Sequence, residues 1–158
     1  MRIFTALSIA CGLALFGCER QAGELESATA TESAAAPAMS RRPPPAGASV
    51  YIISPADGDE LASPVRVAFG LRGAGVAPAG VDSPNTGHHH LLIDAEMVSF
   101  DLPIPSDAQH VHFGLGQTET MVELPPGDHR LQLLLGDHLH VPHDPPLLSE
   151  PITIRVVE

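Results

Sequence analysis

The sequence of 158 residues has no lysine and no tryptophan, and it has a single tyrosine. All eight of its basic residues are arginines, and against 19 acidic residues they leave a formal net charge of −11 at pH 7. Because so acidic a surface repels phosphate backbones and anionic headgroups, nucleic-acid binding and basic membrane docking are disfavoured. The sequence also has 16 prolines and 14 glycines, which argue against a helical bundle, since proline breaks helix interiors.

The apolar stretch Ile3–Phe16 is short for a membrane-spanning helix. Its 14 residues follow a basic start, whereas a spanning helix needs about 17–25, so the stretch suits a signal-peptide core. It ends in Leu15-Phe-Gly-Cys18, which resembles a bacterial lipobox. We therefore expect a signal peptide over residues 1–17 and a lipidated Cys18 that anchors the protein to the outer membrane in the periplasm, or secretion if the lipobox is not used.

Thiol chemistry is excluded from the expected mature protein. The only cysteines are Cys11, which lies inside the expected leader, and Cys18, so no pair remains for a disulfide or a CxxC motif. Residues 18–48 are rich in Ala, Ser, Thr, Glu and Pro and have too few apolar side chains to offset the entropy of folding. We expect a disordered tether there and a folded, histidine-rich domain over residues 49–158.

The apolar residues of this domain follow a period of two. Alternation with turn signals between the runs is typical of half-buried antiparallel strands. About seven such strands predict an all-β, immunoglobulin-like antiparallel sandwich. The expected strands are Val50–Ile53, Val65–Leu71, Gly87–Ile93, Glu119–Leu124, Leu131–Leu135 and Ile152–Val156, with short ones at Ala95–Phe100 and His110–Phe113.

All nine histidines lie between residues 88 and 143, and three groups contain a His-x-His pair. On a strand this spacing points both rings to the same face. Next to Leu91 and Ile93, the alternation predicts that His89 points into the core. His88 and His90 should then point outward.

The expected topology brings several of these rings together. The third strand of such a sandwich pairs antiparallel with the sixth, which would place His88 and His90 beside the residues that follow Leu135. Imidazoles are good ligands for Cu²⁺ or Zn²⁺, and we take one of these as the expected cofactor. The candidate ligands are His88, His90, His110, His112, His140 and His143, and the residues that could orient them are His89, Asp94, Glu119 and His138.

Other roles for these residues remain open. His129 has a structural explanation as a hydrogen-bonding corner residue, His89 as a core histidine, and His143 as a brace for a Pro-rich loop. The histidines could instead form a metal-free polar network that orders the loops of a module contacting an envelope protein. Catalysis by a metal-bound water with Glu119 or Asp94 as base is a third class, but no nucleophile motif supports it.

Four motifs in order resemble a family of bacterial exported domains, the domain of unknown function 4399. They span Thr86–Asp94, His110–Glu119, Leu124–Leu135 and His140–Pro146. The resemblance covers about Val50 to Val157 and implies a small exported domain, often anchored or tethered, but no activity or ligand. The metal site is therefore an inference from the residues. The matching positions are His88, His89, His90, Asp94, His110, His112, Glu119, His129, His140 and His143.

Overall fold

The computed structural model of the protein describes residues 39–97 and 99–158, so the expected signal peptide and Cys18 lie outside the described residues. The described residues form strands and no helix, and therefore no helix that could cross a membrane. The strands are β1 (Ser49–Ser54), β2 (Glu60–Ala62), β3 (Val65–Arg72), β4 (Gly75–Val76), β5 (Thr86–Ile93), β6 (His110–His112), β7 (Glu119–Val122), β8 (Gly127–Gly136) and β9 (Ile152–Val157).

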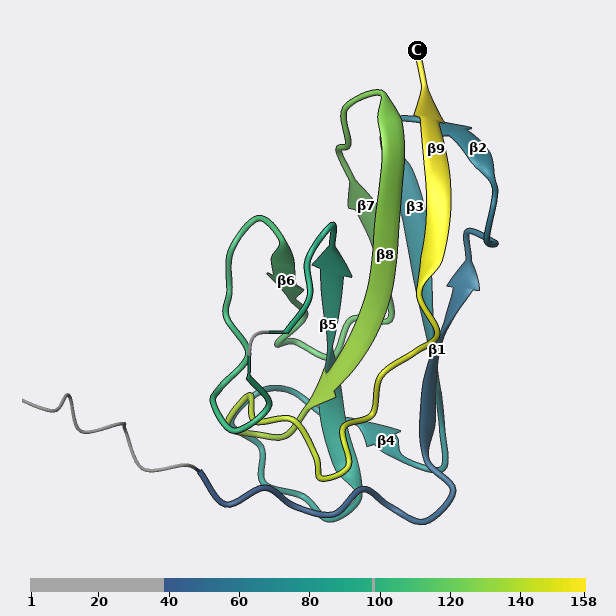
Figure 1. Ribbon diagram of the computed structural model, residues 1–158. Coiled ribbons are helices and arrows are strands. Elements are labelled where there is room, and N and C mark those ends of the chain that lie inside the picture. The colour runs from purple at the N-terminus through teal and green to yellow at the C-terminus, as the bar shows by residue number, and fades with distance from the viewer. Residues whose placement is uncertain (1–38, 98) are drawn as a thin grey trace, which may run out of the picture. The chain divides into compact units, whose positions relative to one another are not determined.

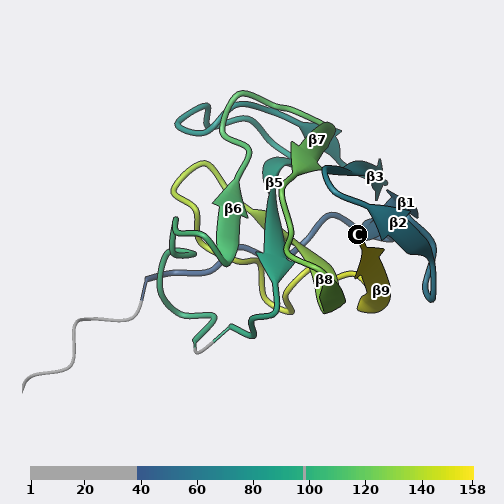
Figure 2. The ribbon, with the colours of Figure 1, turned by 90° about the horizontal axis from the view of Figure 1, so that it is seen from above.

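The strands form two sheets (Figures 1 and 2). One has the order β1-β3-β7, and the other has the order β2-β9-β8-β5-β4, with β6 also paired to β5. The long strands pair antiparallel, and only the short strands β2 and β4 pair in parallel. The predicted immunoglobulin-like sandwich is thus confirmed by strand order. β5 pairs antiparallel with β8, and, apart from the short strand β2, the chain changes sheet between β3 and β4, between β6 and β7 and between β7 and β8.

The core lies between the sheets and is mainly aliphatic. Val67, Leu91 and Leu133 are fully buried, as the alternation predicts. The rings of Phe69 and Phe113 add an aromatic contact with centroids 4.7 Å apart. Because burying one such aliphatic side chain contributes about 1.5–3 kcal/mol, this layer is what holds the two sheets together.

The expected strand at Ala95–Phe100 is wrong for the part of it that the structure describes. Residues 95–97 and 99–100 form bends and irregular chain instead. The side chains of Met97 and Phe100 do pack, against Leu92 and Ile104 on the outer face of the β5–β8 sheet, meaning the face turned away from the other sheet. In this short stretch, the alternation of apolar residues therefore reflects burial of side chains and not pairing of strands.

His129 at the start of β8 closes a corner of the fold, as expected. Its Nδ1 lies 2.7 Å from Asp94 Oδ2 and its Nε2 lies 2.8 Å from the Pro125 carbonyl oxygen. Both partners are acceptors, so the ring donates from both nitrogens and is an imidazolium. Burial alone lowers the pKa of His129, but the hydrogen bonds to Asp94 and Pro125 overcome this effect, and its pKa is raised.

The tether expected over residues 18–48 falls outside the described residues up to residue 38. Its last ten residues, 39–48, which we call the N-terminal strap, make specific contacts. Arg41 donates from Nε to the Pro142 carbonyl oxygen at 3.2 Å and from Nη2 to that of His143. Arg42 accepts a backbone hydrogen bond from Asp144 and forms a two-pronged ion pair with Asp82, at 2.6 and 3.0 Å. The strap is therefore bonded to the loop between β8 and β9.

Because the pKa of His129 is raised in the folded chain, its contribution is complete below the unfolded value of about 6.5 and is lost as pH rises through the folded value. We expect the free energy of unfolding to fall on this account above neutral pH. His129→Gln should lower stability by about 1–3 kcal/mol and remove that part of the pH dependence. Urea denaturation between pH 6 and pH 9 measures both effects, and an unchanged slope in the variant would contradict the assignment.

Arg41→Ala should destabilise the domain by about 1–3 kcal/mol, because it leaves the part-buried carbonyl groups of Pro142 and His143 without their side-chain donor. The matched control is Arg66→Ala, which removes an exposed ion pair with Glu119 and should cost less than about 1 kcal/mol. Chemical denaturation of both variants tests the strap, and equal losses would show that the Arg41 contacts contribute no more than a surface ion pair.

Candidate metal centre

Strand alternation divides the run of three histidines on β5 between two faces. His89 points into the core, where its ring lies 5.3 Å from that of Phe69 between centroids. His88 and His90 share the outer face, with centroids 4.9 Å apart. All three side chains have an exposed fraction of 0%, so the outward pair is not solvated: irregular chain, including the segment of Ile104, covers this part of the sheet.

β6 contributes a third ring through its register with β5. His112 is paired with His90, and facing residues in a sheet point to the same side. The His112 ring centroid consequently lies 5.0 Å from that of His90 and 5.0 Å from that of His88. His110 points to the same face two residues away, but it faces Leu92 in the register.

The fourth ring comes from the loop after β8. The His140 centroid lies 4.9 Å from that of His88, 4.7 Å from that of His112 and 5.9 Å from that of His90. His112 and His140 are half-buried, so they form the outer side of the group. We call His88, His90, His112 and His140 the histidine cluster.

The absence of a side chain at two glycines makes room for the rings of His90 and His112. A Cβ atom on Gly136 would lie 3.1 Å from Nε2 of His90, and one on Gly114 would overlap the ring of His112. Any larger residue at these positions would displace a ring of the cluster. Sequence reasoning assigned neither glycine this packing role, although each adjoins a histidine motif in the sequence.

Three rings of the cluster, those of His88, His90 and His112, have a lowered pKa and bury nitrogens that have no hydrogen-bond partner in the described part of the chain. Both ring nitrogens of His88 and His90, and Nε2 of His112, are buried without a hydrogen-bond partner among the described residues. Burial first, then the neighbouring rings of the cluster, lowers the pKa of His88 to about 4 and that of His90 to about 2. Burial followed by His140 also lowers the pKa of His112. Neutral imidazole is the form that binds metal ions.

The arrangement can hold a metal ion. One ring nitrogen each from His88, His90 and His112 lies within 4.8 Å of the others, and His140 stands beside them. Sites of three or four imidazoles suit Zn²⁺ and Cu²⁺. The rings of His88, His90 and His112, from β5 and β6, could therefore hold an ion of the kind expected from the sequence, and the loop after β8 brings the ring of His140 beside them.

The remaining candidate ligands lie elsewhere. His110 Nδ1 lies 2.9 Å from Asp107 Oδ1, and this pair is outside the cluster. Glu119 is exposed and pairs with Arg66, while Asp94 is held by His129.

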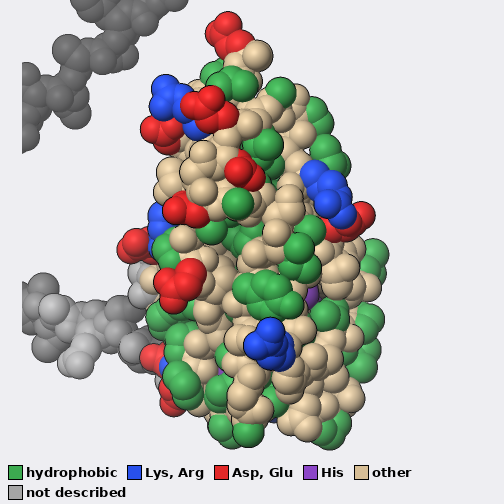
Figure 3. All heavy atoms as spheres, turned by 90° about the vertical axis from the view of Figure 1, so that its right-hand side faces the viewer, with side chains coloured by type: hydrophobic (Ala, Val, Ile, Leu, Met, Phe, Trp, Pro, Cys, Tyr) green, Lys and Arg blue, Asp and Glu red, His purple; other side chains and the backbone are tan. Residues whose placement is uncertain are grey.

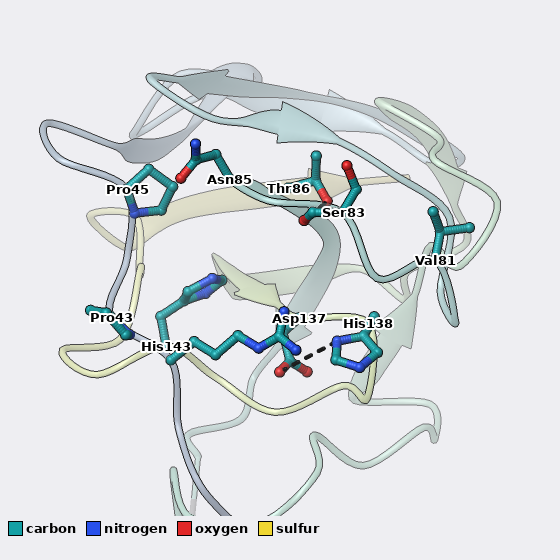
Figure 4. A pocket seen from close by; sticks show the side chains of 10 residues that line it. Pro43, Pro45, Val81, Ser83, Asn85, Thr86, Asp137, His138 and His143 are labelled. Atoms are coloured by element: carbon teal, nitrogen blue, oxygen red, sulfur yellow. Dashed lines mark hydrogen bonds and ion pairs between the residues drawn. The ribbon is translucent and has the colours of Figure 1, made fainter.

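His138 and His143 line a small polar pocket of about 50 Å³ beside Asp137, shown in Figure 4. In this view the His138 ring faces the Asp137 carboxylate, and its Nδ1 lies 3.9 Å from Oδ2. The same ring lies 3.7 Å through Nε2 from Asp82. His143 is 4% exposed and contributes no ring to the cluster. On the face of the molecule shown in Figure 3, only small parts of histidine side chains reach the surface.

The metal-free domain should lose stability in mild acid. Below about pH 6.5 the unfolded chain protonates these histidines, whereas the buried rings of His88 and His90 stay neutral. Stability is therefore complete above this pH, and roughly 2–4 kcal/mol should be lost between pH 7 and pH 5. Urea denaturation with a chelator present measures the change. Equal free energies of unfolding at the two pH values would show that the rings are protonated when folded.

Among the comparisons with known proteins, one family model identifies the family, and none of them adds an activity. The family model described as domain of unknown function (DUF4399) matches residues 67–157. No curated protein matches the chain. A solved structure of fibronectin(III)-like modules of Clostridium thermocellum CbhA is similar at 13% identity and a TM-score of 0.35, and the match covers 69% of this chain and 45% of that one. The chain thus spans less than half of that structure.

Proposed function

The chain belongs to the DUF4399 family, and we propose that it binds one divalent transition-metal ion through His88, His90 and His112, with the adjacent ring of His140 as the fourth ligand. In this proposal the protein handles or delivers the metal in the periplasm, where a lipid on Cys18 holds it to the outer membrane. The lipobox-like sequence supports the anchor, and the histidine cluster supports the metal.

The observation that carries the proposal is the state of the buried ring nitrogens. A polar group buried without a partner costs about 1–3 kcal/mol, and His88 and His90 alone bury four such nitrogens. A metal-free network that orders loops would have to satisfy its members with hydrogen bonds, and these two rings have none among the described residues. A metal ion would engage the lone pairs that the fold leaves free.

The spacing of the rings favours Zn²⁺ over Cu²⁺. Four imidazoles bound at about 2.0–2.1 Å in a tetrahedron have ring centroids roughly 5 Å apart. A square-planar set, which suits Cu²⁺, has four separations of roughly 4.5 Å and two of roughly 6.5 Å. The six separations in the cluster run from 4.7 to 5.9 Å, close to the tetrahedral pattern.

Four protein ligands also favour binding over catalysis. Catalytic zinc sites keep one position for water, whereas structural and storage sites are closed by protein ligands. His112 and His140 are half-buried, in contrast to the fully buried His88 and His90. Exchange with a partner protein would therefore proceed from the side of His112 and His140.

Zn²⁺ should raise the melting temperature of the domain, and a chelator should reverse the effect. At a concentration 100 times the dissociation constant, a ligand stabilises the folded state by about 2.7 kcal/mol. Thermal melts with Zn²⁺ and Cu²⁺ at pH 7.5, together with calorimetric stoichiometry, measure the binding. We expect one equivalent of Zn²⁺ and a smaller shift with Cu²⁺ at matched concentration.

Matched variants separate this site from adventitious binding by surface histidines. His112→Ala and His140→Ala should each weaken Zn²⁺ binding by at least tenfold. His110→Ala removes a ring from the same strand and the same face and should leave the affinity unchanged. Equal affinities in all three variants, or no stabilisation of the parent protein, would refute the proposal.

A further inference from the structure

Asp137 follows β8 directly and organises the five-residue loop 137–141. Its Oδ1 accepts hydrogen bonds from the backbone N–H groups of Leu139, at 2.8 Å, and Val141, at 2.9 Å. Its own carbonyl oxygen accepts from His140 N at 2.9 Å, and its N–H donates to the Val141 carbonyl oxygen at 3.0 Å. Four hydrogen bonds from one residue thus fix the path of the loop.

His140 needs this support because its backbone is strained. It has a φ of +67°, in the left-handed region, which costs a residue other than glycine roughly 1–2 kcal/mol. Such a conformation persists only where the surroundings over-determine it. Here the His140 N–H is bonded to Asp137, and the His140 carbonyl oxygen accepts from Ile104 N at 2.8 Å. With this backbone, the His140 ring centroid lies 4.9 Å from that of His88 and 4.7 Å from that of His112.

The Asp137 side chain is directed toward the backbone of the loop and not toward solvent. The residue is only 4% exposed, and burying a carboxylate is costly unless it is well hydrogen-bonded. An asparagine could accept the same two N–H bonds through Oδ1 without that cost. The negative charge of the Asp137 carboxylate would also partly offset the charge of a bound dication. Substitutions can therefore separate the effect of this charge from the effect of the two hydrogen bonds.

We infer that Asp137 is the positioning residue of the metal site, which holds His140 in the fourth ligand position through the loop 137–141. The inference rests on the proposed function. Asp137 touches no metal in this scheme and acts mainly through His140. The main effect comes from the two backbone bonds that Oδ1 accepts, and the charge contributes less.

The test is a double-mutant cycle between Asp137 and His140, with Zn²⁺ affinity measured by chelator competition. Asp137→Ala should weaken binding about 10–100-fold, as expected for loss of a residue that orients a ligand. In a His140→Ala background the same substitution should cost less than about twofold, because its target is already gone. Equal losses in both backgrounds would overturn the inference.

Two conservative variants separate position from charge. Asp137→Asn keeps an oxygen where Oδ1 stands and should bind Zn²⁺ within about fivefold of the parent. Asp137→Glu keeps the charge but moves the oxygens by one methylene, and it should bind as weakly as Asp137→Ala. The reverse order, with Glu close to the parent and Asn weak, would mean that Asp137 acts by charge and would refute positioning. Both variants remain informative if Asp137→Ala fails to fold.

Co²⁺ provides a readout that loss of stability alone does not change. The parent should give the intense visible bands of tetrahedral Co²⁺, and Asp137→Ala and His140→Ala should give the same altered spectrum, because both lack the fourth ring. Asp82→Asn, which removes an exposed carboxylate beside His138, is the control and should keep the parent spectrum. If the parent binds metal but Asp137→Ala keeps the parent spectrum, only the positioning role fails; if the parent binds no metal, the proposed function fails as well.

Discussion

The antiparallel register between β5 and β8 is the constraint on which the histidine cluster depends. It pairs His88 with Gly136 and Ile93 with Leu131. The start of β5 therefore lies beside the end of β8, next to the loop that follows β8. A shift of one residue along β5 would send His88 and His90 into the aliphatic core and turn His89 outward. The same apolar alternation that stabilises the sandwich therefore decides which imidazoles can meet.

Much of this arrangement could be predicted from the sequence. Leu91 and Ile93 fix the phase of β5, and strand pairing in an immunoglobulin-like sandwich brings the start of β5 to the end of β8. What alternation cannot give is the path of irregular chain. His110 and His112 share a face, and only their register with β5 decides that His112 meets His90 whereas His110 meets Leu92. The cover over His88 and His90 comes from loops that have no periodicity.

The loop after β8 shows the same limit. His138, His140 and His143 lie within six residues, yet only His140 enters the cluster. A positive φ and the hydrogen bonds of Asp137 select it. Neither feature has a sequence signature strong enough to act on, because aspartate is common in turns of every kind. Burial has a further effect: it lowers the pKa of His88, His90 and His112, so that metal binding by these rings would displace few protons.

The N-terminal strap has a mechanical consequence. In Figure 1 it runs along the end of the domain where β5 begins, while β9 ends at the opposite end. Its hydrogen bonds go to Pro142, His143 and Asp144, a few residues from His140. A force applied to the chain ahead of residue 39 would load this loop before it strained either sheet. Tension along that segment would thus disturb the position of His140 in the histidine cluster while the sandwich stayed intact.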